Sequence, residues 1–404
     1  MFEAIGNDWT LLLIPPIAAF IGWFTNWQAV KMMFYPLEFR GIRPWFGWQG
    51  IVPANAVSLA GKSTDLITTK LMTLRELFAT FKGDEFKKHL GPAMDEATDQ
   101  VMADLGKSAG PTWAAMPDPV KAQVRMMVRA EIDKVNVAIL DDMAADIEKI
   151  LDLRGIVTAA AARDKKLITE MFQTVGRKEL RFITDSGAYF GLLFGIPQMI
   201  TWIYWPTWWQ LPFCGFLVGY ITNWLALKLV FQPRHPVKVG PFTVHGLFHK
   251  RQEQVAKEFA RLVAGEIINP ENMVAHMTQG AAGEHLFAII DRHIGAMIDR
   301  YRSNPMTAML VPAERWDGLK TEVMARMREE LPKPGGFLHI FTRHSVDVHG
   351  ELFTRMTRLD PISFEGVLRP AFQQDEWKLI VIGGVLGLAA GIFQVLYMFR
   401  DYVA

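Results

Sequence analysis

Histidine side chains are concentrated in the second half of the sequence, which holds nine of the ten. His245 and His249 stand four residues apart, and His344, Asp347 and His349 lie close together. Imidazoles combined with a carboxylate can bind zinc, so metal binding is one interpretation of both clusters. No HExxH or similar signature is present, and we therefore expect surface histidines, no metal site and no cofactor.

A phosphate-binding loop is the second chemistry to consider. Residues 56–63 read AVSLAGKS, a relaxed P-loop pattern with alanine in the first glycine position. A P-loop needs a strand before it and a helix after it. Here the preceding residues predict a loop at the membrane interface, so we do not expect nucleotide binding.

Nucleophilic or acid–base catalysis is not indicated either. The sequence has no GxSxG motif and no plausible Ser/His/Asp order, and its single cysteine, Cys214, lies in an apolar run. Asp141 and Asp142 fall on the polar face of a predicted helix, where solvation by water is the usual explanation. A net charge of +1 gives no basic field for nucleic acid. We expect no catalytic residues and no nucleic-acid partner.

The elements that position these residues are dominated by long apolar segments. About 20 apolar residues span a bilayer, and four segments fit: residues 9–30, 186–205, 210–227 and 379–399. Residues 206–209 (PTWW) predict a tight turn rich in aromatic residues between the second and third segments. The expected fold class is an all-α membrane protein with four transmembrane helices.

Basic residues lie almost entirely on one side of the four predicted spans. They are Lys31, Arg40, Arg43, Arg177, Lys178, Arg181, Lys228, Arg234, Lys238, Arg369 and Lys378, with Arg400 alone on the other side. By the positive-inside rule, both termini lie outside the cytoplasm, and residues 31–185 and 228–378 lie inside it. The first span has no basic residue before it and no cleavage site after it, so we expect an uncleaved anchor.

One phrase occurs twice in the sequence. GWFTNWQAVKMMFYP (22–36) and GYITNWLALKLVFQP (219–233) share 8 of 15 residues at a spacing of 197. GLLFGIPQ (191–198) and GLAAGIFQ (387–394) correspond at a spacing of 196, and Asp164 falls opposite Asp360. A nearly constant spacing predicts duplication of a two-span unit, with a first repeat at 1–205 and a second at 206–404.

The repeated phrase places polar residues inside the predicted membrane region. They are Thr25 and Asn26 in the first copy and Thr222 and Asn223 in the second. An unpaired amide in hydrocarbon is costly, so each asparagine should face protein or water. Two hypotheses follow: a structural anchor bonded to a neighbouring span or loop, or a polar vestibule for a headgroup or solute.

Other residues of the spans indicate lipid contact and helix packing. Lys31 and Lys228 follow the asparagines by five positions and should reach lipid phosphates. Small residues four apart let helices approach closely in lipid. The glycines with this spacing are Gly187, Gly191 and Gly195, then Gly383, Gly387 and Gly391, and finally Gly215 and Gly219.

The two long polar segments predict helical arms. Apolar residues recur at helical spacing from Val120 to Ile150, which predicts one continuous helix there, and again from Leu286 to Tyr301. Asp118 and Pro119 form a good helix start. Trp45, Phe46 and Trp48, in the loop after the first span, predict a collar at the headgroup level.

The doubled GxxTNWxAxKxxFxP phrase, the loop after it and RKELRF (177–182) resemble the domain-of-unknown-function 445 family of bacterial membrane proteins. The second copy has QQDEWK in place of the RKEL stretch. The resemblance implies a multi-pass protein of the cytoplasmic (inner) membrane and supplies no catalytic residues.

The function expected is a non-enzymatic membrane scaffold whose helical arms engage a partner protein or lipid at the inner leaflet, with a homo-oligomer also open. The alternative is a transporter or channel for a small solute or lipid along the repeat interface. Against transport stands the lack of acidic or basic residues within the predicted spans. An enzyme acting on lipid is a third alternative, without a candidate nucleophile or base.

Overall fold

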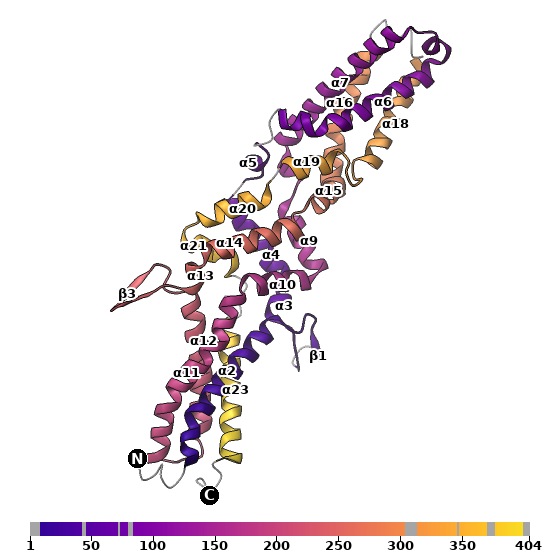
Figure 1. Cartoon of the computed structure of the whole chain (residues 1–404). Coiled ribbons are helices and arrows are strands. Elements are labelled where there is room, and N and C mark those ends of the chain that lie inside the picture. Colours follow the sequence, from indigo (N-terminus) through magenta and orange to yellow (C-terminus); the bar gives the residue numbers. More distant parts are fainter. Residues whose placement is uncertain are drawn as a thin grey trace. The chain divides into compact units, whose positions relative to one another are not determined.

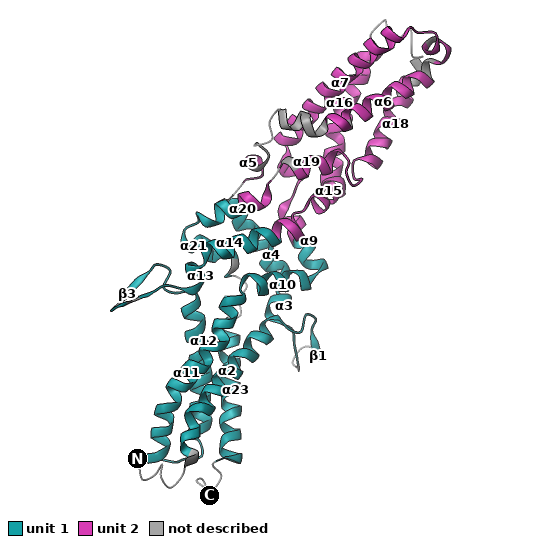
Figure 2. Ribbon diagram, viewed as in Figure 1, with its two compact units in different colours: residues 1–71, 158–262, 352–404 teal, residues 72–157, 263–351 magenta. Residues whose placement is uncertain are grey.

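The computed structural model describes residues 9–42, 46–71, 73–79, 84–303, 313–345, 347–369 and 376–398. The chain forms two compact units, each built from both halves of the sequence (Figure 2). Unit 1 comprises residues 1–71, 158–262 and 352–404, and unit 2 comprises residues 72–157 and 263–351. The described residues are mostly helical, as expected of an all-α fold, with two short hairpins as the exceptions.

Unit 1 holds four long helices and a set of short ones. The long helices are α2 (Ile14–Phe34), α11 (Arg177–Tyr204), α12 (Gln210–Phe231) and α23 (Glu376–Tyr397). The short ones are α3 (Ile51–Ala54), α4 (Ala56–Leu66), α10 (Lys165–Val175), α13 (Leu247–Lys250), α14 (Gln252–Leu262) and α21 (Pro361–Leu368), with a 3-10 turn at Trp9–Leu13 and a π-helical turn at Ile67–Leu71. Strands β1 (Arg40–Ile42) and β2 (Phe46–Trp48) form one antiparallel hairpin, and β3 (Val237–Val239) and β4 (Phe242–Val244) form the other.

The four long helices pack side by side (Figure 1). Helix α2 packs on α11, α12 packs on α23, and α11 joins the two pairs through α12. One end of this bundle is closed by a buried cluster of Leu11, Ile14, Met199, Trp202 and Leu211. The turn between α11 and α12 lies at that end, so α2 and α12 run in one direction and α11 and α23 in the other.

Among the described helices, two are long and apolar enough to cross a membrane, α12 and α23. The prediction of four spans is therefore not confirmed on length and composition alone. The sequence of α2 includes tryptophan, proline, asparagine and glutamine, and α11 begins with charged residues, which lower the hydropathy of both helices.

All four helices nevertheless expose apolar side chains on the outside of the bundle. On α11 these include Tyr189 (74% exposed) and Leu193 (58%), and on α2 they include Phe20 (61%). Helix α23 exposes Phe393, Leu396 and other apolar residues along the same face. Soluble monomers rarely expose large apolar patches, and such patches mark surfaces that contact protein or membrane.

Elements of the two halves recur at the spacing seen in the sequence. Adding 196 to the bounds of α3, α4 and the π-helical turn gives those of α13, α14 and a second π-helical turn, Val263–Ile267. Asp164 caps α10 by accepting from the amides of Lys166 and Leu167, and Asp360 caps α21 in the same way. The halves therefore share these elements in order, and their origin by duplication stays a prediction.

Unit 2 is a helical body. Its helices are α5 (Leu74–Ala79), α6 (Asp84–Ala114), α7 (Asp118–Ala145), α8 (Ile147–Ile150), α15 (Pro270–Thr278), α16 (Gly280–Arg302), α18 (Ala313–Glu330) and α19 (Phe337–Ser345). Helices α9 (Leu153–Arg163) and α20 (Val348–Thr357) run across the division between the units. The apolar stripe from Val120 to Ile150 is broken into α7 and α8 at Asp146, so one continuous helix was a wrong prediction.

The helices of the two halves pack against one another in unit 2. Helix α16 packs on α7 and α8, and α19 packs on α6. Met94, at the centre of one cluster, contacts residues of both halves, including Ile132 and Phe337. The polar segments of the two halves thus form one helical body, where the sequence had suggested two separate arms.

Candidate functional site

Glycines bring α2 and α11 together at backbone distance. A Cβ atom added to Gly187 would lie 2.2 Å from the carbonyl oxygen of Gly22, and one added to Gly191 would lie 2.3 Å from that of Ala18. One added to Gly195 would lie 2.7 Å from Pro15 Cα. Any side chain at these three positions would force the helices apart.

The pair α12 and α23 meets in the same way. A Cβ atom on Gly387 would lie 2.0 Å from the carbonyl oxygen of Gly215, and one on Gly219 would lie 2.1 Å from that of Gly383. A Cβ atom on Gly391 would lie 2.4 Å from the carbonyl oxygen of Leu211. Every glycine singled out in the sequence lies at one of these two helix contacts.

The two asparagines of the repeated phrase bond to the backbone of the paired helix. Asn26 Nδ2 donates to the carbonyl oxygen of Ile183 on α11 at 2.7 Å. Asn223 Nδ2 donates to the carbonyl oxygen of Leu379 on α23 at 2.9 Å. Ile183 and Leu379 are themselves 196 residues apart, and both amides are almost fully buried. Each asparagine therefore links its own helix to the next long helix of the same half.

The two threonines are buried, and one of them contacts the other half. Thr25 Oγ1 donates to the carbonyl oxygen of Gly22 at 3.1 Å, within its own helix. Thr222 Oγ1 lies 3.5 Å from Asn26 Oδ1 and 3.4 Å from the carbonyl oxygen of Gly219. Thr222 thus places a polar contact between α12 and α2, where the two halves meet.

Lys31 and Lys228 lie in the last turns of α2 and α12 and are exposed. The Lys31 ammonium lies 5.0 Å from the ring centroid of Trp27, and the Lys228 ammonium lies 4.6 Å from that of Trp224. The aromatic ring holds each cation close to its own helix. Asn26 precedes Lys31 by five residues, so it lies roughly 7 Å from Lys31 along the helix axis, toward the middle of α2, at 1.5 Å per residue.

A buried ion cluster beyond the C-terminal end of α12 was missed in the sequence. Glu365 on α21 is 2% exposed, and Arg234 Nε donates to its Oε2 at 2.7 Å. Arg369 contacts the other carboxylate oxygen, and His249 Nε2 lies 3.6 Å from Oε2. Burial alone raises the pKa of Glu365, but the His249 ring and the Arg234 and Arg369 guanidinium groups outweigh it and lower this pKa to about 2.

The sequence signal for this cluster is a single carboxylate in an apolar run. Glu365 lies within the sequence PISFEGVL. The preceding residue, Phe364, stacks on Phe248 with ring centroids 4.7 Å apart. A charge that shares a helix face with core residues indicates a buried ion pair. The cluster ties α21 to the residues that follow α12, where the chain leaves the bundle.

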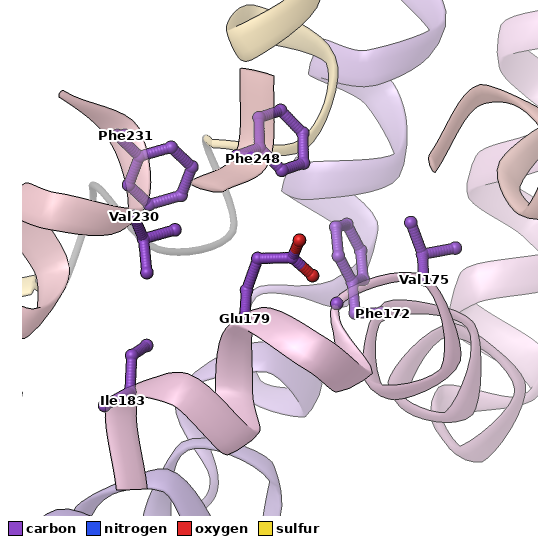
Figure 3. Close-up of a pocket in the computed structure, with 8 residues that line it drawn as sticks. Phe172, Val175, Glu179, Ile183, Val230, Phe231 and Phe248 are labelled. Carbon is purple, nitrogen blue, oxygen red and sulfur yellow. The ribbon is translucent and has the colours of Figure 1, made fainter. Parts of the chain in front are cut away.

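A second buried carboxylate, Glu179, lies at the start of α11 in the RKEL stretch. Arg251 Nη1 donates to Glu179 Oε1 at 2.5 Å. Glu179 Oε2 is buried and has no hydrogen-bond partner among the described residues. Figure 3 shows the carboxylate between Phe172 and Phe248, beside a cavity of about 20 Å³ that matches one water molecule.

The histidines are distributed differently from the expectation. His249 is buried, so the prediction of a surface histidine is wrong there, and His245 is part-buried with Nε2 3.2 Å from the carbonyl oxygen of Arg234. The two rings stack with centroids 6.1 Å apart. Among the described residues, no group of three His, Cys, Asp or Glu side chains could hold a metal ion. The side chain of His344 lies outside the described residues, whereas Asp347 and His349 are exposed.

Other histidines join the two halves within unit 2. His285 Nε2 lies 2.9 Å from Asp146 Oδ2, and His293 Nε2 lies 2.7 Å from Asp142 Oδ2. Arg292 also donates to Asp142 at 2.7 Å. The prediction that Asp142 is merely solvated is therefore wrong, because α16 supplies partners that lie far away in the sequence.

The remaining sequence candidates have simple locations. Residues 56–63, the P-loop-like stretch, lie entirely within helix α4, which lacks the strand and loop of a phosphate site. Trp48 donates from Nε1 to the carbonyl oxygen of Met32 at 3.0 Å, and so fixes the first hairpin to the end of α2. Trp45 and the side chain of Phe46 lie outside the described residues.

Parts of the chain are similar to bacterial membrane proteins. A protein of Synechococcus sp. named UPF0754 membrane protein is 31% identical over 96 residues, 23% of each chain. One from Bacillus cereus is 28% identical over 119 residues, 29% of this chain and 30% of its own, and one from Cyanothece sp. is 36% identical over 66 residues, 15% and 16%. The chain thus matches less than a third of the length of these relatives. No protein-family profile matches the chain, and no solved structure does.

Proposed function

We propose that this chain is a non-enzymatic scaffold of the bacterial cytoplasmic membrane, built as a tandem repeat of a two-span unit. Helices α2, α11, α12 and α23 would be the four spans, and residues 31–185 and 228–378 would lie in the cytoplasm. The names of the relatives and the resemblance to the domain-of-unknown-function 445 family support a membrane location.

One observation carries the proposal of an anchor. The polar groups of the repeated phrase are buried and point at backbone carbonyls of the paired span, as in Asn26 to Ile183 and Asn223 to Leu379. In hydrocarbon such bonds satisfy groups that would otherwise be costly to bury. The motif therefore fixes spans to one another, which a scaffold needs and a solute path does not.

The outer surface of the bundle supports burial in lipid. All four helices expose apolar side chains, and the turn between α11 and α12 exposes Trp205, Trp208 and Trp209. Tryptophan is favoured at membrane–water interfaces. The basic residues gather at the opposite ends of the four helices, which supports placing those ends in the cytoplasm.

The alternative of a transporter or channel has less support. Transport sites near the midplane are typically formed by broken helices with ionisable groups. Where the two halves meet, the polar groups Thr222 and Asn26 contact each other and are buried. The protein partner, a lipid or a second copy of the chain would instead bind the cytoplasmic helices.

Topology is the direct test of this proposal. In a Cys214→Ser background, single cysteines at positions 3 and 403 should react with an impermeant thiol reagent in intact cells. An Asp141→Cys variant should react only after the cells are permeabilised. Labelling of Asp141→Cys in intact cells, or extraction of the protein from membranes by alkaline carbonate, would overturn the proposal.

A further inference from the structure

An open groove borders the cytoplasmic end of α2. Its volume is about 540 Å³, within the range of small-molecule sites. The last turns of α2 form one wall, and α10 with the start of α11 forms the other. Its lining includes Trp27 and the polar side chains of Lys31, Glu170, Gln173, Thr174 and Arg177.

The groove carries positive charge that the protein does not neutralise. Lys31 and Arg177 are exposed, and among the described residues neither pairs with a carboxylate. One acidic residue also lines the groove, Glu170, and it pairs with Lys166 at 3.7 Å. The ring of Trp27 holds the Lys31 ammonium at 5.0 Å. Two cations beside an amide and a hydroxyl match a phosphate group.

An apolar track leads away from the groove along α2. Phe20, Trp23, Phe24 and Trp27 stand on the outer face, each more than a third exposed. Neighbouring rings in this column lie 5.9 to 6.3 Å apart between centroids. Trp27 belongs to both features, so the cationic groove and the aromatic column form one continuous surface.

We propose that this surface binds an anionic glycerophospholipid of the cytoplasm-facing leaflet. Its phosphate would occupy the groove between Lys31 and Arg177, and its acyl chains would lie along the column from Trp27 to Phe20. The inference rests on the proposed function, because it requires α2 to span the membrane. A lipid uses both parts of the surface, whereas a free phosphate uses the groove alone.

The second half provides a built-in comparison. Lys228 and Trp224 repeat the arrangement of Lys31 and Trp27, but the residue 196 positions after Arg177 is Gln373. The residue corresponding to Gln173 is Arg369, which is occupied by Glu365. Lys228 is therefore a matched lysine without the second free cation, and it serves as the control.

The test is a lipid titration of the purified, delipidated full-length protein in detergent, followed by native mass spectrometry. Phosphatidylglycerol and phosphatidylcholine are the probes. The Lys31→Gln/Arg177→Gln variant should lose about thirtyfold in phosphatidylglycerol affinity, about 2 kcal/mol at 1.4 kcal/mol per decade. This loss corresponds to about 1 kcal/mol of binding free energy for each of the two basic residues at an anionic surface. Lys228→Gln, which removes a lysine without a second cation beside it, should lose no more than about fivefold.

Several outcomes would overturn the proposal. These are unchanged phosphatidylglycerol affinity in the double variant, an equal loss in Lys228→Gln, and complete competition by millimolar inorganic phosphate, which would indicate a free-phosphate site. If the double variant unfolds, the exposed single change Arg177→Gln should still lose about fivefold. Carbonate extraction is scored separately: an integrated protein without lipid preference refutes only the groove, whereas an extracted protein refutes the membrane scaffold.

Discussion

Gly387→Ala is the sharpest test of how α12 and α23 pack. The added Cβ atom would lie 2.0 Å from the carbonyl oxygen of Gly215, where ordinary contacts between heavy atoms are about 3.5 Å. The carbonyl oxygen is part of the backbone of α12, and the position of the Cβ atom is fixed by the backbone of α23. Neither atom can therefore rotate away from the other. The two helices must therefore separate by roughly 1 to 1.5 Å at this point.

The expected cost follows from what that separation disturbs. Overpacking of a close contact typically costs about 1 to 3 kcal/mol. The Asn223–Leu379 hydrogen bond, at 2.9 Å, joins the same two helices and would lengthen, which removes about 1 kcal/mol more. Gly387→Ala should therefore destabilise the bundle by about 2 to 4 kcal/mol, measured by denaturant unfolding in detergent micelles.

A matched glycine separates this effect from helix propensity. Gly318 on α18 has no atom within 4 Å of an added Cβ atom. Gly318→Ala should leave stability unchanged or raise it by up to about 1 kcal/mol, because alanine favours the helix. If Gly387→Ala unfolds at the wild-type midpoint, α12 and α23 do not touch at this glycine and the packing described for the bundle is wrong.

Two further changes test the buried polar groups. The folded-state pKa of Glu365 is about 2, below its ordinary 4.5, so its contribution to stability is complete above about pH 4.5 and is lost as the pH falls toward 2. Glu365→Gln should flatten that part of the unfolding-versus-pH curve, a difference of about 3 kcal/mol, and an unchanged curve would refute the pairing. Replacing Asn26 and Asn223 together with leucine should unfold the bundle or displace the short helices that follow it, seen as lost monodispersity and faster proteolysis. A variant that folds normally yet loses a transport activity would favour the vestibule instead.

Local features were the ones the sequence could predict. The glycine spacing depends on a single helix, and the correspondence of Asp164 with Asp360 depends on the repeat alone; both aspartates cap a helix in the structure. The return of the phrase around Asn26 and Asn223 predicted equivalent surroundings for the two amides, and their carbonyl partners are indeed 196 residues apart. Periodicity and local chemistry are enough for such predictions.

Long-range partners were beyond such reasoning. Glu365 meets Arg234 across 131 residues, and Asp142 meets His293 across 151. The Glu365 pair has no counterpart in the first half, since Thr169 stands where the equivalent of Glu365 would be expected. Which acid meets which base depends on how the halves pack, and no period in the sequence encodes that.

The mixed origin of unit 2 has a consequence for synthesis on the ribosome. Helix α7 buries Val135, Ile139 and Met143, and it packs on α16, which begins only at Gly280. Translation at about 5 to 20 residues per second leaves that apolar stripe without its later partner for on the order of ten seconds. During this interval the stripe can contact other apolar surfaces, so the nascent chain is most prone to aggregation before α16 emerges.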